Sequence, residues 1–276
     1  MNAFTAADWT AYPFATQNRQ DYFNLLSVYL DATFFPNLDP LDFAQEGIRV
    51  ELDDHGKPQY KGIVFNEMKG AMSGEIDQLY HSLARHLFPT TTYHYNSGGE
   101  PAAITELTHA DLVKFHHSHY HPSNAVVMSF GNIPVAETQA RIHDDALAVA
   151  GKAFGKGQKH ASRLEQALSA PVAVTERYHV DSVKPKQTHH VMAWLLPSIL
   201  DGKQRLAMRL LEGVLVEHAG SPLRAYLDSH PLASAPTPLL GLDDSHYQMV
   251  FYAGVRGSEP EHGDAIEQGI LDLLKQ

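Results

Sequence analysis

The sequence predicts an α+β fold built as two successive domains, and three observations support this prediction. Segments with apolar residues at helical spacing are interspersed with short segments of strand type, joined by connections of hairpin length. A hydrophobic content of 43% with 19% charged residues is typical of a globular chain with a core. A length of 276 residues suits about two domains. We therefore expect antiparallel sheets covered by helices.

The first domain is expected over residues 1–150. Its first helix has Asn18 as a candidate N-cap and ends before Pro36. Asp111 lies in the first turn of a later helix that opens at Thr108 or His109. The predicted helices of this domain span residues 18–35, 62–87, 108–120 and 134–150, and the predicted strands span residues 47–52 and 124–131.

A linker is predicted over residues 151–171, which are rich in Gly, Lys and Ala and lack periodicity. The second domain is expected over residues 172–276. Its predicted strands span residues 172–180, 188–197 and 246–257, and its predicted helices span residues 204–216, 221–230 and 264–276. The last helix has no stop signal, and the chain opens on an extended segment without a preceding partner. We therefore expect the first domain to be incomplete at its N-terminus and the second at its C-terminus.

Charge and composition exclude several classes of protein. With 21 basic and 32 acidic residues the net charge is −11, which argues against nucleic-acid binding. No apolar run reaches the roughly 20 residues of a membrane span. The absence of cysteine excludes disulfides and thiolate metal sites. Together with the lack of a transit segment, it favours a bacterial cytoplasm, with the mitochondrial matrix or plastid stroma as alternatives.

The segment "KGIVFNEMKGAMS" (residues 61–73) places a carboxylate, Glu67, among small and apolar residues. On a helix Glu67 shares a column with Gly70 and Gly74, and glycine inside a helix costs about 1 kcal/mol relative to alanine. Periodicity alone favours a solvated glutamate. The glycines also fit a second interpretation, in which another element approaches the backbone closely and shares a metal ion with Glu67.

Three long segments carry a family resemblance: "MNAFTAADWTAYPFATQNRQDYFNLLSVYLDATFFP", "YKGIVFNEMKGAMS" and "YHYNSGGEPAAITELTHADLVKFHHSHYHPSNAVVMSFGNIP". In this order and spacing they resemble the presequence-protease branch of the pitrilysin/insulinase zinc metallopeptidases. The resemblance is close over residues 1 to about 135 and weaker beyond. It implies two successive domains of the pitrilysin/insulinase type and degradation of short unstructured peptides inside a closed chamber.

The resemblance also implies roles for individual residues. In the family, two histidines of an H-x-x-E-H motif and a more distant glutamate hold zinc, and the motif glutamate is the general base. The distant glutamate corresponds to Glu67. The "NAFT" stretch corresponds to an edge strand on which the peptide lies, so Asn2, Ala3 and Phe4 become candidate substrate contacts.

The sequence departs from the family in one respect, because it contains no H-x-x-E-H. In the family that motif precedes "NAFT", so the general base and both zinc histidines are expected upstream of residue 1. One carboxylate is too few for a catalytic zinc site, which needs about three protein ligands. We therefore expect zinc in the full-length protein, and expect this chain alone to be zinc-free and inactive. An uncovered first domain would also favour a homodimer through the exposed surface.

Two other interpretations remain open from the sequence. The chain could belong to a non-catalytic scaffold or peptide-binding homologue of the same fold. A separate metal site could form in "HADLVKFHHSHYH", where His116 pairs with His119 and His117 pairs with His121 at helical spacing. Such histidine pairs more commonly pack in the core or lie on the surface without binding a metal.

Overall fold

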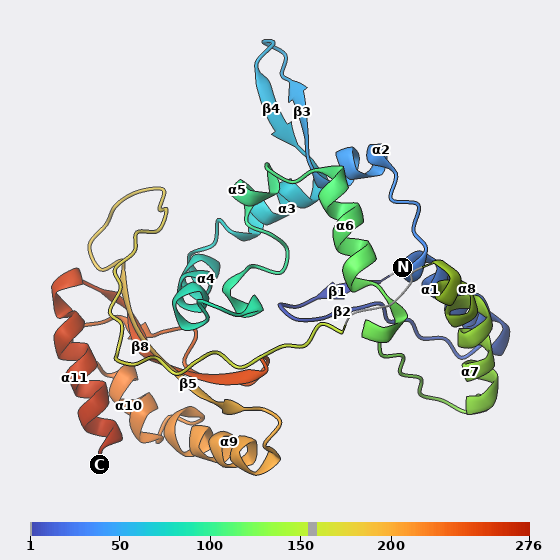
Figure 1. Cartoon of the computed structure of the whole chain (residues 1–276). Coiled ribbons are helices and arrows are strands. Elements are labelled where there is room, and N and C mark those ends of the chain that lie inside the picture. The colour runs from blue at the N-terminus through green and yellow to red at the C-terminus, as the bar shows by residue number, and fades with distance from the viewer. Residues whose placement is uncertain (1, 154–158) are drawn as a thin grey trace. The chain divides into compact units, whose positions relative to one another are not determined.

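The chain folds into two units that interleave along the sequence. The computed structural model describes residues 2–153 and 159–276. The first unit comprises the residues up to Met72 together with Ser97–Ala161, and the second comprises Ser73–Asn96 and Ser162–Gln276 (Figure 1). Each unit mixes helices with antiparallel strands, which confirms the predicted α+β class. The domain limits expected at residues 150 and 171 stay a prediction.

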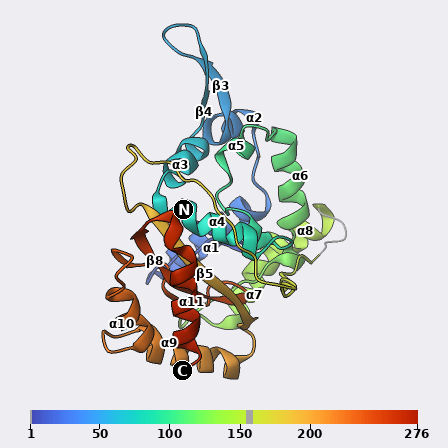
Figure 2. The same cartoon turned by 90° about the vertical axis from the view of Figure 1, so that its left-hand side faces the viewer.

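The first unit is mostly helical. Its described helices are α1 (Arg19–Phe34), α2 (Pro40–Asp42), α3 (Ile63–Ala71), α5 (Pro101–Ile104), α6 (His109–His119), α7 (Val135–Ile142) and α8 (Ala148–Ala153), with single turns η1 (Phe43–Gly47), η3 (Pro122–Asn124) and η4 (His143–Leu147). Its strands form two hairpins, β1 (Phe4–Thr5) with β2 (Thr10–Ala11) and β3 (Arg49–Leu52) with β4 (Pro58–Lys61). The β3–β4 hairpin projects beyond α2 and α3 of its unit (Figure 2).

Two helix starts in this unit follow the capping chemistry of the sequence. The Asn18 side chain accepts a hydrogen bond from the Asp21 amide at 3.0 Å, which fixes the start of α1. Thr108 and Asp111 form a reciprocal capping box at the start of α6. Both predicted helix starts are confirmed.

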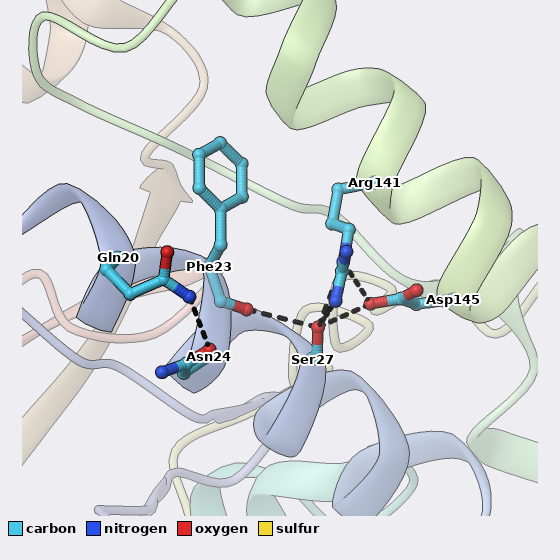
Figure 3. A network of polar contacts seen from close by, with 6 residues as sticks. All are labelled: Gln20, Phe23, Asn24, Ser27, Arg141 and Asp145. Atoms are coloured by element: carbon cyan, nitrogen blue, oxygen red, sulfur yellow. Dashed lines mark hydrogen bonds and ion pairs between the residues drawn. The ribbon is translucent and has the colours of Figure 1, made fainter.

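Helix α1 is joined to α7 and η4 by an apolar cluster and a polar network. Leu26, Leu30 and Phe34 pack against Ala146 of η4. Beside them, the Ser27 hydroxyl accepts hydrogen bonds from Arg141 Nε and Nη2 at 3.0 and 2.8 Å and lies 2.5 Å from Asp145 Oδ2 (Figure 3).

We expect Ser27→Ala to lower the free energy of unfolding by about 1 kcal/mol, because it removes one hydrogen-bonding hub between α1 and η4. Urea denaturation followed by circular dichroism measures the change. Gln20→Ala is the matched control, because the Gln20–Asn24 contact on the same helix is exposed and should contribute little. Equal effects of the two substitutions would contradict the assignment of Ser27 as a packing hub.

The second unit contains the larger sheet. Its described helices are α4 (Glu75–Leu87), α9 (Gly202–Val216), α10 (Pro222–Asp228) and α11 (Gly263–Leu274), with 3₁₀ turns η2 (Thr92–His94) and η5 (Pro260–His262); its strands are β5 (Thr188–Ser198), β6 (Ala235–Pro236), β7 (Gly241–Asp243) and β8 (Gln248–Ser258). Strand β8 is central and pairs antiparallel with the other three.

Both faces of β8 are covered within this unit. Ala253 and Val255 point to one face, where they pack with residues of α9, α10 and α11. Val250 and Tyr252 point to the opposite face by strand alternation, and they are 0% and 2% exposed. Because both faces are buried, β8 reads as a nearly continuous apolar run, which explains why it could be predicted.

The prediction of one helix over residues 62–87 was wrong. Helix α3 ends at Ala71 and α4 begins at Glu75, and the two helices belong to different units. Gly74 has extended backbone angles (φ −69°, ψ 138°) that no helix can continue through. The amphipathic pattern runs across the break, so periodicity joined two separate helices.

The strands predicted over residues 124–131 and 172–180 were also wrong. Neither segment belongs to a strand in the described part of the chain. In the first segment, Val126, Met128 and Phe130 are 95%, 90% and 102% exposed. A strand requires a neighbouring strand to satisfy its backbone, and propensity alone cannot supply one. The strands expected near residues 47–52, 188–197 and 246–257 are confirmed.

No helix in residues 2–153 or 159–276 is both long and apolar enough to cross a membrane.

Candidate functional site

Glu67 lies on the exposed side of α3. The helix is anchored by Phe65, which is 9% exposed, and by Met68, and both pack against Ile48 and Ile104. Because the Phe65 and Met68 side of α3 is packed, Glu67 projects away from the cluster and is exposed. Its carboxylate has no hydrogen-bond or ion-pair partner among the residues that the structure describes. It is therefore available to a ligand that approaches from solvent.

The space beside Glu67 is open in the described part of the first unit. A β-carbon built on Gly70 meets nothing within 4 Å, and Gly74 lies outside α3. The close approach of another element at these glycines therefore stays a prediction. Gly62, directly before α3, does have a close neighbour, because a β-carbon there would lie 2.0 Å from the Gly47 carbonyl oxygen.

The candidate substrate contacts lie at the start of the chain. Asn2, Ala3 and Phe4 are exposed, and Phe4 opens β1 with 60% of its surface accessible. The Asn2 backbone amide donates to the Tyr29 hydroxyl at 2.9 Å. That amide is therefore occupied, and a peptide that added to this edge would need other backbone groups of the strand.

The sequence did not predict that the loop Ser97–Gly99 contacts both β1 and α3, the helix that carries Glu67. The Ser97 hydroxyl lies 3.5 Å from the Thr5 carbonyl oxygen of β1, at the long end of hydrogen-bond range. The backbone of Gly98 packs on Met68, so that a β-carbon on Gly98 would lie 2.1 Å from the Met68 sulfur. The loop thus connects β1 with the helix that carries Glu67. The consecutive glycines Gly98 and Gly99 were the available signal in the sequence.

The separate metal site considered for the histidines of residues 109–121 does not form in the described structure. His116 is buried, its Nε2 donates to the Thr33 carbonyl at 2.9 Å, and burial lowers the pKa of its imidazole. His119 instead stacks on His160, with ring centroids 4.0 Å apart. His121 Nδ1 accepts from the Ser123 amide. These contacts are structural roles for His116, His119 and His121.

The second unit contains a buried polar cluster that links α4 to β7 and to the turn between β7 and β8. His246 is 7% exposed, and its Nε2 lies 3.1 Å from the Tyr80 hydroxyl. Its Nδ1 lies 3.4 Å from Asp243 Oδ2, and Ser245 donates to Asp243 from both its amide and its hydroxyl. Burial opposes ionisation of Asp243, but the hydrogen bonds from His246 and Ser245 outweigh it and lower its pKa to about 2.

The same cluster raises a tyrosine pKa. Burial and the negative charge of Asp243 raise the pKa of Tyr80 to about 12. Phe88 and Tyr93 pack their rings around His246, with centroids 5.5 and 4.8 Å away. The polar atoms of the cluster are paired and its rings are packed. We therefore interpret the cluster as a structural contact that holds α4 to the sheet.

The residues present do not by themselves fit a zinc ion. In the described ranges, no group of three or more His, Asp or Glu side chains is placed to hold a metal. Glu67 supplies one carboxylate, whereas a zinc site needs about three protein ligands. Further ligands would have to come from outside this chain.

Comparison with known proteins identifies the family. A family model described as "Peptidase M16 inactive domain" matches residues 106–276. The chain belongs to the peptidase M16 family. "Presequence protease, mitochondrial" of Xenopus laevis is 38% identical over 283 aligned residues, which cover 100% of this chain and 27% of the relative. The protein of the same name from Mus musculus is 39% identical over 93% of this chain and 25% of its own length.

These similarities confirm the expected resemblance to the presequence-protease branch of this zinc metallopeptidase family. A third relative with that name, from Schizosaccharomyces pombe, is 36% identical over 99% of this chain and 28% of its own length. The chain therefore spans about a quarter of the length of the curated relatives that it matches. Glu67 lies outside the matched family model.

Solved structures support the fold. A protease from Helicobacter pylori superposes with a TM-score of 0.59 at 16% identity, covering 99% of this chain and 62% of that one. An M16 inactive domain from Pseudomonas fluorescens gives 0.61 at 15% identity, covering 95% and 57%. At these identities the similarity concerns the fold alone.

Proposed function

We propose that this chain is a segment of a zinc metalloendopeptidase that degrades short unstructured peptides of the presequence type in a closed chamber. The observation that supports the proposal is the 38% identity to a presequence protease along the entire chain. In this proposal the segment contributes Glu67 as one zinc ligand and the Asn2–Phe4 edge as a peptide contact. The two zinc histidines and the general base come from polypeptide outside the segment.

The arrangement of the first unit supports this division of roles. Glu67 is exposed and unpaired in the described structure. The small and apolar residues around it in the sequence offer its carboxylate no hydrogen-bond or ion-pair partner. The Ser97–Gly99 loop contacts both β1 and the Glu67 helix, so it would keep the peptide edge and the ligand in register. Held in this way, a bound peptide and the metal would keep a constant separation.

We expect this chain alone to show no chelator-sensitive hydrolysis of an unstructured peptide, with or without added zinc. One carboxylate cannot bind zinc with useful affinity, and no general base is proposed within the segment. Mass spectrometry of a quenched peptide digest measures the result. Cleavage that stops on addition of 1,10-phenanthroline would contradict the proposed division of roles.

In the longer protein, we expect Glu67→Gln to lower zinc affinity by about 100-fold or more, because the neutral amide is a poor zinc ligand. Metal analysis after dialysis measures this without relying on activity. Glu46→Gln is the matched control, since Glu46 is another exposed glutamate of the first unit. Full zinc occupancy in the Glu67→Gln protein would exclude Glu67 as a ligand.

A non-catalytic homologue is the second candidate. It is favoured by the description of the matching family model, whose name is that of an inactive domain. The two candidates differ in the reading frame ahead of residue 1, where an intact H-x-x-E-H supports the peptidase and its absence supports the scaffold.

The compartment is proposed from the relatives. The three curated relatives named above are all called mitochondrial, which favours the mitochondrial matrix. They lend no support to the bacterial cytoplasm that was expected from the sequence. The homodimer expected through an uncovered first domain stays a prediction.

A further inference from the structure

Tyr29 of α1 is a buried tyrosine whose hydroxyl reaches the candidate peptide edge. It is 8% exposed, and its ring packs on Phe14 with the two centroids 5.0 Å apart. Its hydroxyl accepts a hydrogen bond from the Asn2 backbone amide at 2.9 Å, from a residue 27 positions earlier in the chain. A side chain fixed in the first unit therefore holds the backbone of the segment that is proposed to contact the peptide.

The register of the β1–β2 hairpin explains why Asn2 needs this partner. Strand β1 pairs with β2 over two residues only, with Phe4 opposite Ala11. The same register would place Asn2 opposite Pro13, which lies beyond the end of β2. No described strand residue continues the ladder at that position. The Tyr29 hydroxyl accepts the hydrogen bond that a longer β2 would otherwise accept.

The same hairpin shows which edge of β1 Tyr29 contacts. In an antiparallel strand the N–H and C=O of one residue point to the same edge, and successive residues alternate between the two edges. The Ala6 amide donates to the Trp9 carbonyl oxygen and so faces β2. Continued toward the N-terminus, this alternation directs Asn2 to the β2 edge and Ala3 to the opposite edge. Tyr29 therefore holds the segment from the side away from an added peptide.

We propose that Tyr29 is a positioning residue for the peptide edge. Its hydroxyl holds the Asn2 amide and keeps the segment extended, so that the backbone groups of Ala3 are aligned for an unstructured peptide. The inference rests on the proposed function, in which Asn2, Ala3 and Phe4 contact the peptide.

The physical basis is the cost of ordering an edge strand during binding. A peptide that adds to a sheet gains its affinity from main-chain hydrogen bonds, which require the receiving strand to be extended. A strand that is ordered only when the peptide arrives loses part of that affinity, whereas a strand held in advance does not. Tyr29 contacts no peptide in this arrangement, and it acts through the Asn2 backbone.

Tyr29→Phe in the longer protein tests the proposal, because it removes the hydroxyl and leaves the ring on Phe14. Asn2 is exposed, so its freed amide bonds to water and the fold persists. Hydrogen exchange followed by mass spectrometry should be about fivefold faster over residues 2–5 and unchanged in α1. Tyr22→Phe is the matched control. Tyr22 lies on the same helix and its ring also packs on Phe14, with centroids 5.6 Å apart, so this variant should exchange like the wild type.

Kinetics on an unstructured peptide separate positioning from general loss of structure. In the zinc-loaded longer protein, Tyr29→Phe raises KM about fivefold, while kcat and bound zinc stay within about twofold of the wild type. Tyr22→Phe leaves all three unchanged.

The outcomes distinguish the inference from the proposed function. A wild-type longer protein that does not cleave the peptide contradicts the proposed function and the inference with it. Cleavage with an unchanged KM in Tyr29→Phe overturns the inference alone. Unchanged exchange over residues 2–5, or a parallel fall of kcat and bound zinc, overturns it as well.

Discussion

Replacing Gly62 by alanine should lower the free energy of unfolding by about 3 kcal/mol, because the added methyl group meets main-chain atoms that cannot move aside. A β-carbon on Gly62 would lie 2.0 Å from the Gly47 carbonyl oxygen, 2.6 Å from its carbon and 3.0 Å from the Ile48 α-carbon. Gly62 is buried and directly precedes α3, so relief of the clash would displace the helix that carries Glu67. Urea denaturation measures the loss.

Gly70→Ala on the same helix is the control, and its expected effect has the opposite sign. Gly70 lies inside α3, where a β-carbon meets nothing within 4 Å. Alanine is favoured over glycine in a helix by about 1 kcal/mol, so this variant should be more stable than the wild type. A Gly62→Ala variant as stable as the wild type would contradict the close approach of Gly47 to Gly62.

The elements that could be predicted are those whose signals are local. Caps and stops lie within a few residues of the helix that they bound, as Asn18 and Thr108 illustrate. Strand β8 was visible because burial on both faces leaves a continuous apolar run. In such segments the local preference and the tertiary environment favour the same structure.

The elements that were missed depend on partners distant in sequence. The apolar run at residues 124–131 has strand composition, but no described strand pairs with it. The break at Gly74 was hidden because α3 and α4 continue one amphipathic pattern although they belong to different units. Periodicity indicates which side of a segment is apolar, but it does not indicate which unit of the chain that side packs against.

In the candidate site too, local features could be predicted from the sequence, whereas contacts between distant residues could not. Glu67 was identified only through the family resemblance, since its helical position alone favoured a solvated side chain. The role of Gly98 could not be predicted, because it depends on Met68, thirty residues earlier in the chain, packing on the loop backbone. Tertiary proximity of this kind leaves no trace in the spacing of a single sequence.

Removing the charge of Asp243 should make the chain less sensitive to acid. The pKa of Asp243 is lowered to about 2 in the folded state, against about 3.9 for an aspartate in an unfolded chain. A lowered folded-state pKa contributes stability above pH 4 and loses it as the pH falls from about 4 to 2. The shift corresponds to at most about 2.5 kcal/mol, and we expect 1 to 2 kcal/mol because part of the carboxylate is solvent-screened.

Asp243→Asn should therefore be less stable than the wild type at pH 7 by about 1 to 2 kcal/mol, and the difference should shrink towards pH 2. The cause is local, since the carboxylate loses its charge-assisted contacts to Ser245 and His246 while His246 still holds Tyr80. Urea denaturation at a series of pH values measures both curves. Asp272→Asn, at an exposed position on α11, should follow the wild type at every pH. A constant gap between the Asp243→Asn and wild-type curves would mean that the loss comes from packing and not from the ionised carboxylate.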